Sequence, residues 1–287
     1  MNRRFAAVLV PLLSLSLAAC AGADGVNKAE VAATPADPKA ALAASTAGLK
    51  AGDYSFTATI PGGTEAKGMV HIPSHSASLD MTIEEDETKG AIQYRIIEPN
   101  RFMKINMDLG EAVGDLREME EMADASPEMK KMVDGLKAMT EMFSGKYWMR
   151  VDMSKLKASD MQVNLEDPDL VGAGGLLGGV VTAQRTGSAI TGTLDASALK
   201  GKGQMFGEEA FDGLAADKAK ALPYEATLDA EGRLSKLVLD VPKVADTPAG
   251  KWTVNYTGYG EATEQQKPTG KVKEMPKDGY DMLNSKG

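Results

Sequence analysis

Methionine is concentrated in one part of the chain, where its thioether sulfur could do chemistry. Eleven of the 17 methionines lie between Met103 and Met161, and residues 117–143 contain three Met-x-x-Met pairs. Thioether sulfur binds Cu(I), and methionine also fills irregular cores and lines adaptable binding surfaces. The pattern leaves three interpretations open: a copper site, an ordinary core, or a flexible cover over an apolar ligand.

The other residues with catalytic or metal-binding potential do not complete a motif. His71 and His75 are spaced for a metal only on a helix, but a proline stands between them, and zinc sites usually use three or four protein ligands. Residues 154–157 match Ser-x-x-Lys without a Lys-Thr-Gly partner, and residues 84–87 form an acidic run typical of a solvated turn. Nucleotide-binding, hydrolase and metalloprotease motifs are also missing from the sequence. We therefore expect neither an enzyme nor a cofactor.

The first 19 residues have the layout of an export signal. Two arginines precede an apolar run from Phe5 to Leu17, which is shorter than the ~20 residues of a membrane-spanning helix. The following residues, Leu17-Ala18-Ala19-Cys20, resemble the lipobox of bacterial lipoproteins, and Cys20 is the single cysteine of the chain. We therefore expect residues 1–19 to be removed and Cys20 to be acylated, which anchors the protein to the outer face of the cell membrane.

Composition divides the remaining chain into three parts. Residues 20–36 are small and polar and predict a flexible tether, residues 37–262 carry the periodic patterns of a folded domain, and residues 263–287 predict a loosely ordered tail. Removing the two arginines of the signal makes the chain more acidic than its formal net charge of −9. This acidic balance argues against nucleic acid as a partner.

The folded part predicts an α+β domain. Asp37-Pro38 is typical of a helix start, and an Ala-rich helix is expected to run to Lys50. Apolar residues then alternate with polar ones in segments separated by turn residues, as in an antiparallel meander. Strands are expected near 54–60, 67–72, 76–83, 90–97, 101–107, 146–153, 182–195, 222–230, 233–241 and 251–259, and further helices near 110–123, 127–143 and 207–220. A sheet of roughly nine to eleven strands has to curl strongly.

This order of elements resembles the LppX/LprG/LprA/LprF family of actinobacterial envelope lipoproteins. The resemblance lies in EDPDLVGAGGLLGGVVTAQRTGSAITGTLDAS (166–197), in LPYEATLDAEGRLSKLVLD (222–240) and in the last strand with Trp252 and Tyr256. It implies a strongly curved antiparallel sheet, or half-barrel, with helices on its concave face enclosing an apolar cavity for acylated lipids. The candidate cavity-lining residues are Phe56, Met103, Ile105, Tyr147, Met149, Leu170, Leu177, Val181 and Trp252.

A Met-rich helical hairpin at about 108–146 departs from this family pattern. Ser126-Pro127 predicts the start of its second helix, whose apolar residues follow a single stripe. Neither His nor Cys lies in the insertion, so packing over a ligand explains the spacing better than copper does. The candidate lid residues are Met119, Met122, Met129, Met132, Leu136, Met139 and Phe143.

The glycine-rich segment 172–179 leaves two interpretations open. It could be a loop or thin helix packed closely on the sheet, or a pliable gate whose leucines face a lipid chain. Together, these features predict a lipoprotein that binds acylated lipids and carries or presents them in the envelope. Its expected partners are the membrane, the lipid and an envelope transporter or other envelope protein. A scaffold lipoprotein with a filled core is the alternative, and a Met-rich copper protein is a lesser one.

Overall fold

The computed structural model describes residues 35–284, apart from 86–87, 111–115, 117–118, 121–125, 158–164, 200–203, 207, 212 and 245–246. The predicted signal peptide, Cys20 and Met122 lie outside the described residues.

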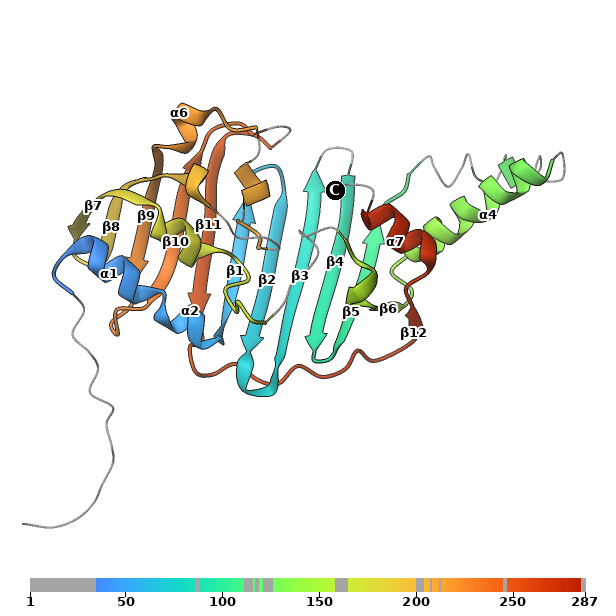
Figure 1. Cartoon of the computed structure of the whole chain (residues 1–287), viewed down its shortest axis with the longest axis horizontal. Coiled ribbons are helices and arrows are strands. Elements are labelled where there is room, and N and C mark those ends of the chain that lie inside the picture. The colour runs from blue at the N-terminus through green and yellow to red at the C-terminus, as the bar shows by residue number, and fades with distance from the viewer. Residues whose placement is uncertain are drawn as a thin grey trace, which may run out of the picture. The chain divides into compact units, whose positions relative to one another are not determined.

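The described residues form one large curved sheet that does not close into a barrel (Figure 1). Its 12 strands follow the order β12-β6-β5-β4-β3-β2-β1-β11-β10-β9-β8-β7, and every neighbouring pair is antiparallel except β12 and β6. The strands are β1 (Asp53–Ile60), β2 (Thr64–His71), β3 (Ser76–Glu85), β4 (Thr88–Ile97), β5 (Asn100–Met107), β6 (Trp148–Val151), β7 (Val180–Thr186), β8 (Ala189–Leu194), β9 (Leu222–Leu228), β10 (Leu234–Val241), β11 (Gly250–Thr257) and β12 (Val272–Glu274). The predicted α+β class with a curved, mostly antiparallel sheet is confirmed.

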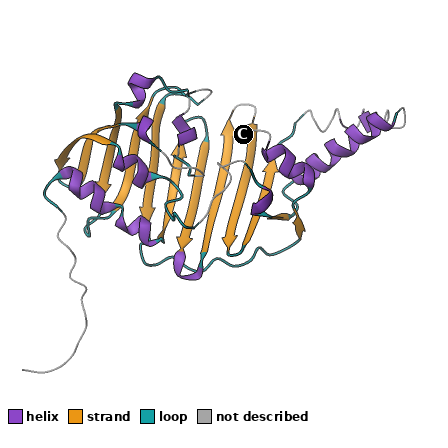
Figure 2. Cartoon of the chain, in the orientation of Figure 1, coloured by secondary structure: helices purple, strands orange, loops and turns teal. Residues whose placement is uncertain are grey.

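The helices are few and mostly short (Figure 2). They are α1 (Pro38–Ser45), α2 (Ala47–Ala51), α4 (Pro127–Met142), α5 (Ala173–Gly178), α6 (Ala216–Ala219) and α7 (Lys277–Asn284), with 3-10 turns η1 (Ile72–Ser74), η3 (Met153–Lys155), η5 (Ala196–Ala198) and η6 (Glu208–Phe211). Two predicted helix starts are confirmed, because the Asp37 carboxylate accepts a hydrogen bond from the Ala40 N–H and the Ser126 hydroxyl accepts one from the Met129 N–H.

The predicted helix at 207–220 is wrong, because only the short pieces η6 and α6 form there. Gly213, with a φ of 84°, lies between them in the left-handed region, which ends a right-handed helix. The composition of residues 207–220 favours a helix, but the left-handed backbone at Gly213 interrupts it.

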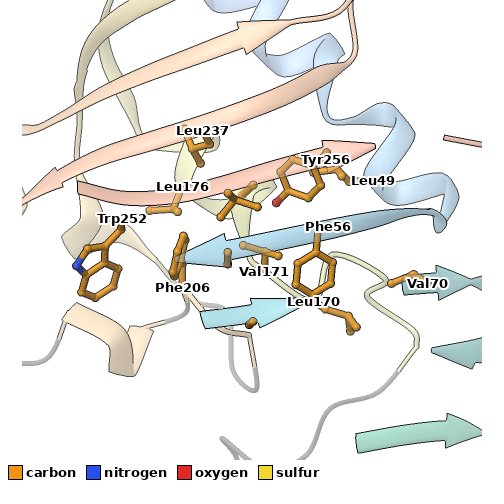
Figure 3. Packing of buried hydrophobic residues seen from close by; sticks show 14 of the residues in the cluster. Leu49, Phe56, Val70, Leu170, Val171, Leu176, Phe206, Leu237, Trp252 and Tyr256 are labelled. Carbon is orange, nitrogen blue, oxygen red and sulfur yellow. The ribbon is translucent and has the colours of Figure 1, made fainter. Parts of the chain in front are cut away.

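The alternation of apolar residues sorts the sheet into two faces. We call the face that carries Tyr54, Phe56 and Ala58 the inner face; all three side chains are buried. Helices α1, α2 and α5 lie over this face at the end of the sheet formed by β7–β11 and β1, where α1 contacts β7 and α2 contacts β1 (Figure 1). Their leucines meet those of the strands in one apolar core (Figure 3). This helix-covered half holds most of the fully buried side chains.

The chain end is more ordered than the sequence indicated. Residues 272–274 form β12, which pairs in parallel with β6, and α7 follows it. Met275 and Tyr280 are buried, and the Tyr280 hydroxyl accepts a hydrogen bond from the Asp152 N–H at 2.7 Å. The prediction of a loosely ordered tail is therefore wrong for residues 272–284, because two apolar side chains in a polar segment are enough to dock it.

Tyr280→Ala should lower the free energy of unfolding by about 3 kcal/mol, since it empties a buried aromatic site and removes a hydrogen bond. Lys277→Ala on the same helix is the matched control, because its side chain is 85% exposed and its ion pair with Asp281 lies in water. Chemical denaturation of both variants measures the difference. Equal stability of the two variants would show that α7 is not docked through Tyr280.

Candidate functional site

The inner face continues beyond the helix-covered half onto β2–β5. The strand register places Ala66, Met81, Ile92 and Ile105 side by side across these four strands. A parallel row to one side holds Thr64, Ile83, Gly90 and Met107, and a row to the other side holds Gly68, Leu79, Tyr94 and Met103. Side chains in such cross-strand rows touch, so the rows form one continuous apolar surface.

Part of this surface is only half covered. Six of its apolar side chains have intermediate exposure, and we call this set the open apolar face. It consists of Ile60, Leu79, Met81, Ile83, Ile92 and Met107. Inward apolar positions of the helix-covered half are different, because Leu237, Leu239 and Val254 are fully buried.

The open apolar face lies between two covered regions of the sheet. On one side are α1, α2 and α5 with the core beneath them. On the other side the inward residues of β5 and β6 are buried again, with Met103 at 2% and Met149 at 0% exposure, where η3, α7 and the end of α4 pack (Figure 1). An apolar surface bounded in this way is a typical feature of ligand or partner sites.

Charge is distributed unevenly over the two faces of β2–β5. The three inward rows contain no charged side chain, and the next inward row ends at Arg101, which is buried and pairs with Glu98 at 3.1 Å. The outer face of the same strands carries Glu65, Lys67, Asp80, Arg95 and Lys104, and Arg95 donates to Asp80 at 2.6 Å. An uncharged surface made mainly of aliphatic and thioether side chains suits hydrocarbon.

Eight of the nine candidate cavity residues are buried in one continuous cluster, in which they lie as two groups at two places on the sheet. Phe56, Leu170, Leu177 and Trp252 belong to the helix-covered half (Figure 3 shows three of them). The second group is at β5 and β6 and consists of Met103, Ile105, Tyr147 and Met149. The open apolar face lies between the groups, and of its residues none was among the sequence-based candidates.

The placement predicted for Val181 is wrong, because this side chain is 49% exposed. Val181 lies on β7, the edge strand, where the register with β8 shifts between Val180 and Thr182. Such an irregularity reverses the faces that alternation assigns. Its carbonyl accepts a hydrogen bond from Lys39 Nζ at 2.7 Å, which also protects the edge.

The Met-rich helix α4 begins and ends close to the predicted bounds. It packs against α7, forms ion pairs through Lys137 with Glu120 and through Glu141 with Lys273, and extends from the β5–β6 end of the sheet (Figure 1). Among the candidate lid residues, Met132 is 48% exposed. The others that the structure describes are half-buried, namely Met119, Met129, Leu136, Met139 and Phe143.

The buried positions of α4 are Val133 and Met142, which the sequence reading passed over. Val133 follows Met129 by four residues and precedes Leu136 by three, so it continues a stripe that Met132 only borders. The helical period is visible in the sequence, but the stripe predicted from it leaves out Val133.

The glycine-rich segment forms the short helix α5, whose Leu176 and Leu177 are buried. Asp169, itself 4% exposed, holds the start of this helix, because its carboxylate accepts from the Gly172 N–H at 3.0 Å and from the Gly174 N–H at 2.6 Å. Burial raises the pKa of Asp169, and the backbone N–H groups oppose that rise. The sequence reading missed this residue, although Asp before a Gly-rich turn is a common capping signal.

Asp169→Ala should destabilise the fold by roughly 2–4 kcal/mol, because the buried N–H of Gly172 and the partly buried N–H of Gly174 lose their acceptor. Asp152→Ala is a matched control: Asp152 caps η3 through the Ser154 N–H, but this bond is exposed, so water replaces the carboxylate. Thermal unfolding of both variants checks the prediction. A loss no larger for Asp169→Ala than for the control would mean that the cap is not needed.

His71 and His75 lie on either side of the turn η1, and their side chains contact residues close to that turn. His71 Nδ1 lies 2.6 Å from the Ser74 hydroxyl, and His75 Nδ1 lies 3.5 Å from a Glu98 carboxylate oxygen. Across the described ranges, His, Cys, Asp and Glu side chains form no group of three that could hold a metal ion.

The same part of the chain contains no helix with the length and apolar character needed to span a membrane. Comparison of the sequence with protein-family models and with curated proteins finds no match.

Proposed function

We propose that this protein is an envelope lipoprotein, anchored through Cys20, that binds acylated lipids on the open apolar face and carries or presents them. The observation that supports this most strongly is the group of six half-exposed apolar side chains on β1 and β3–β5. Covering them with hydrocarbon removes apolar area from water. Each buried methylene contributes about 0.8 kcal/mol, so roughly ten of them offset a large part of the cost of ordering a lipid chain.

The location of the protein gives this surface a source of ligand. A chain tethered to the membrane by an acylated Cys20 and a flexible linker stays near lipid at all times. The resemblance of residues 166–197 and 222–240 to the LppX/LprG family points in the same direction. An envelope transporter or another envelope protein would supply or receive the lipid.

The predicted apolar cavity and the lid formed by the Met-rich hairpin belong to the same proposal. Helix α4 starts from the β5–β6 end of the sheet and carries half-buried Met and Leu side chains outward from it (Figure 1), so it would have to fold back to cover the open apolar face. Methionine adapts to irregular apolar partners, which suits a cover that meets lipid chains of different lengths.

One observation favours the scaffold alternative, in which the protein binds no lipid. Leu176, Leu237 and Val254 have no exposed surface, so the helix-covered half is filled by its own side chains. On this alternative the open apolar face would contact another protein.

Native mass spectrometry of residues 21–287, expressed in a bacterium and purified without detergent, distinguishes these functions. Lipid binding predicts an added mass that organic extraction identifies as an acylated lipid. A protein of the bare sequence mass favours the scaffold. Bound copper that is lost on Met→Leu changes at Met129 and Met132 would instead support the soft-metal interpretation, since leucine keeps the apolar stripe and removes the sulfur.

A further inference from the structure

A polar cleft opens on the outer face of the sheet, on the side opposite the open apolar face. Its volume is about 300 Å³, and it is lined by Ala91 and Gln93 of β4, Lys104 and Asn106 of β5, and residues 144–145. Sites for small molecules in proteins have volumes of about 300–1,000 Å³. The cleft is therefore large enough for one small ligand.

The strand register and one glycine form this cleft. Ala91 lies opposite Asn106 and Gln93 lies opposite Lys104, so a short side chain stands among three longer ones and leaves a gap. The chain returns beside Asn106 at Gly145, whose φ of 68° is in the left-handed region. A Cβ at Gly145 would lie 2.9 Å from the Asn106 Cβ, so glycine lets the loop close one side of the cleft.

Three polar side chains of the cleft are unpaired in the part of the chain that the structure describes. The amide groups of Gln93 and Asn106 and the ammonium group of Lys104 form no hydrogen bond or ion pair with another described residue. Each amide offers both donors and an acceptor, and the ammonium group offers three donors. Their hydrogen-bonding capacity is thus available to a ligand.

Lys104 gives the cleft a positive charge. Of the described residues that line it, Lys104 is the charged one. The nearby cation Arg95 is already paired with Asp80 at 2.6 Å. Lys104 Nζ lies 6.0 Å from the centroid of the Trp148 ring, a cation–π contact that restrains the ammonium group. In a chain with a formal net charge of −9, this restrained cation favours an anionic ligand.

We infer that this cleft binds an acidic sugar, whose carboxylate accepts hydrogen bonds from Lys104 and whose hydroxyl groups bond to Gln93 and Asn106. A hydroxyl group donates and accepts, as an amide does, so neighbouring hydroxyls on one ring satisfy both amides. A simple carboxylate would satisfy Lys104 alone. Because the cleft and the open apolar face lie on opposite faces of the sheet, this inference does not depend on the lipid binding proposed above.

Two sugars that differ at one group test the inference. Residues 21–287 are titrated with methyl glucuronide and with methyl glucoside, which has the same ring and a hydroxymethyl group in place of the carboxylate. The chain has two tryptophans, and Trp252 is only 3% exposed, so a saturable change in fluorescence reports on the half-exposed Trp148 beside Lys104. The glucuronide should bind about tenfold more tightly, as expected for one charge-assisted hydrogen bond. Equal affinities, or binding of neither sugar, would overturn the inference and leave the lipid measurements unaffected.

Lys104→Met keeps an unbranched side chain and removes the charge, so calorimetry should find that this variant no longer prefers the glucuronide. Lys67→Met is the matched control, because Lys67 lies on the outer face of β2 and does not line the cleft. This variant should keep the preference. A preference that persists in Lys104→Met, or that is lost in both variants, would contradict the inference.

Competition with sodium acetate separates a sugar site from a general carboxylate site. Acetate lacks hydroxyl groups for Gln93 and Asn106, so it should displace the glucuronide only at about tenfold or higher concentration. If acetate competes as well as the glucuronide does, the cleft binds any carboxylate and the inference fails.

Discussion

Cys20→Ala should convert the protein from a membrane-bound form into soluble chain or uncleaved precursor. Stable anchoring needs two acyl chains or one chain plus a basic patch, and the acidic chain offers no basic patch near its start. Diacylation of Cys20, as proposed, would supply both chains at one residue. Loss of the thiol therefore removes essentially all strong attachment.

Fractionation of cells at high salt measures this directly. Wild-type protein should sediment with the membrane. The variant should either appear in the soluble fraction or remain a precursor whose mass still includes residues 1–19. A Ser45→Ala variant, changed in the folded part, serves as control for expression and should sediment like wild type. If Cys20→Ala still fractionates with membranes at high salt, a different anchor exists.

Ile92→Glu should reduce lipid retention by roughly 100-fold while leaving the fold intact, because a carboxylate covered by hydrocarbon loses its hydration. Ile92 lies at the centre of the open apolar face and is half-exposed, so the new carboxylate can reach water when no lipid is bound. Gln93→Glu is the matched control. It introduces the same charge at the next residue of β4, which points to the outer face, so this variant should retain as much lipid as the wild type.

The measurement is bound lipid per protein after purification, together with circular dichroism and the unfolding temperature. Loss of lipid from both variants would point to a general effect of charge. Unchanged lipid load in Ile92→Glu would place the ligand elsewhere. Val181→Trp changes a residue that the sequence placed among the cavity candidates; because this edge position is exposed, the variant should leave the lipid load unchanged.

Local signals predicted the elements of this fold well. Asp37-Pro38 and Ser126-Pro127 mark helix starts because a side-chain acceptor and a fixed φ act within one turn. The three strands near the end of the domain form close to their predicted ranges, and β9 and β11 alternate between buried and more exposed residues, whereas the register of β10 shifts between Leu234 and Lys236. The errors arose where contacts between distant parts of the chain determine the structure. Tyr280 is an example, because no local pattern indicates that its hydroxyl bonds to the Asp152 N–H.

The candidate site was harder to predict for a related reason. Alternation shows that Leu79, Met81 and Ile83 share a face, but it carries no information on what covers that face. Coverage depends on where α5 and η3 pack, which are segments about 75 to 95 residues further along the chain. The sequence therefore indicated which side chains point inward and left open which of them stay accessible to a ligand.

The most direct test of lipid binding on the open apolar face is nuclear magnetic resonance of isotope-labelled methionine methyl groups during a lipid titration. Met81 and Met107 lie on that face, whereas Met69 lies on the opposite face of β2 and reports adsorption elsewhere. Binding as proposed predicts saturable shifts of the Met81 and Met107 methyl signals, with Met69 unchanged. Shifts confined to Met69, or none at Met81 and Met107 when lipid is retained, would contradict it.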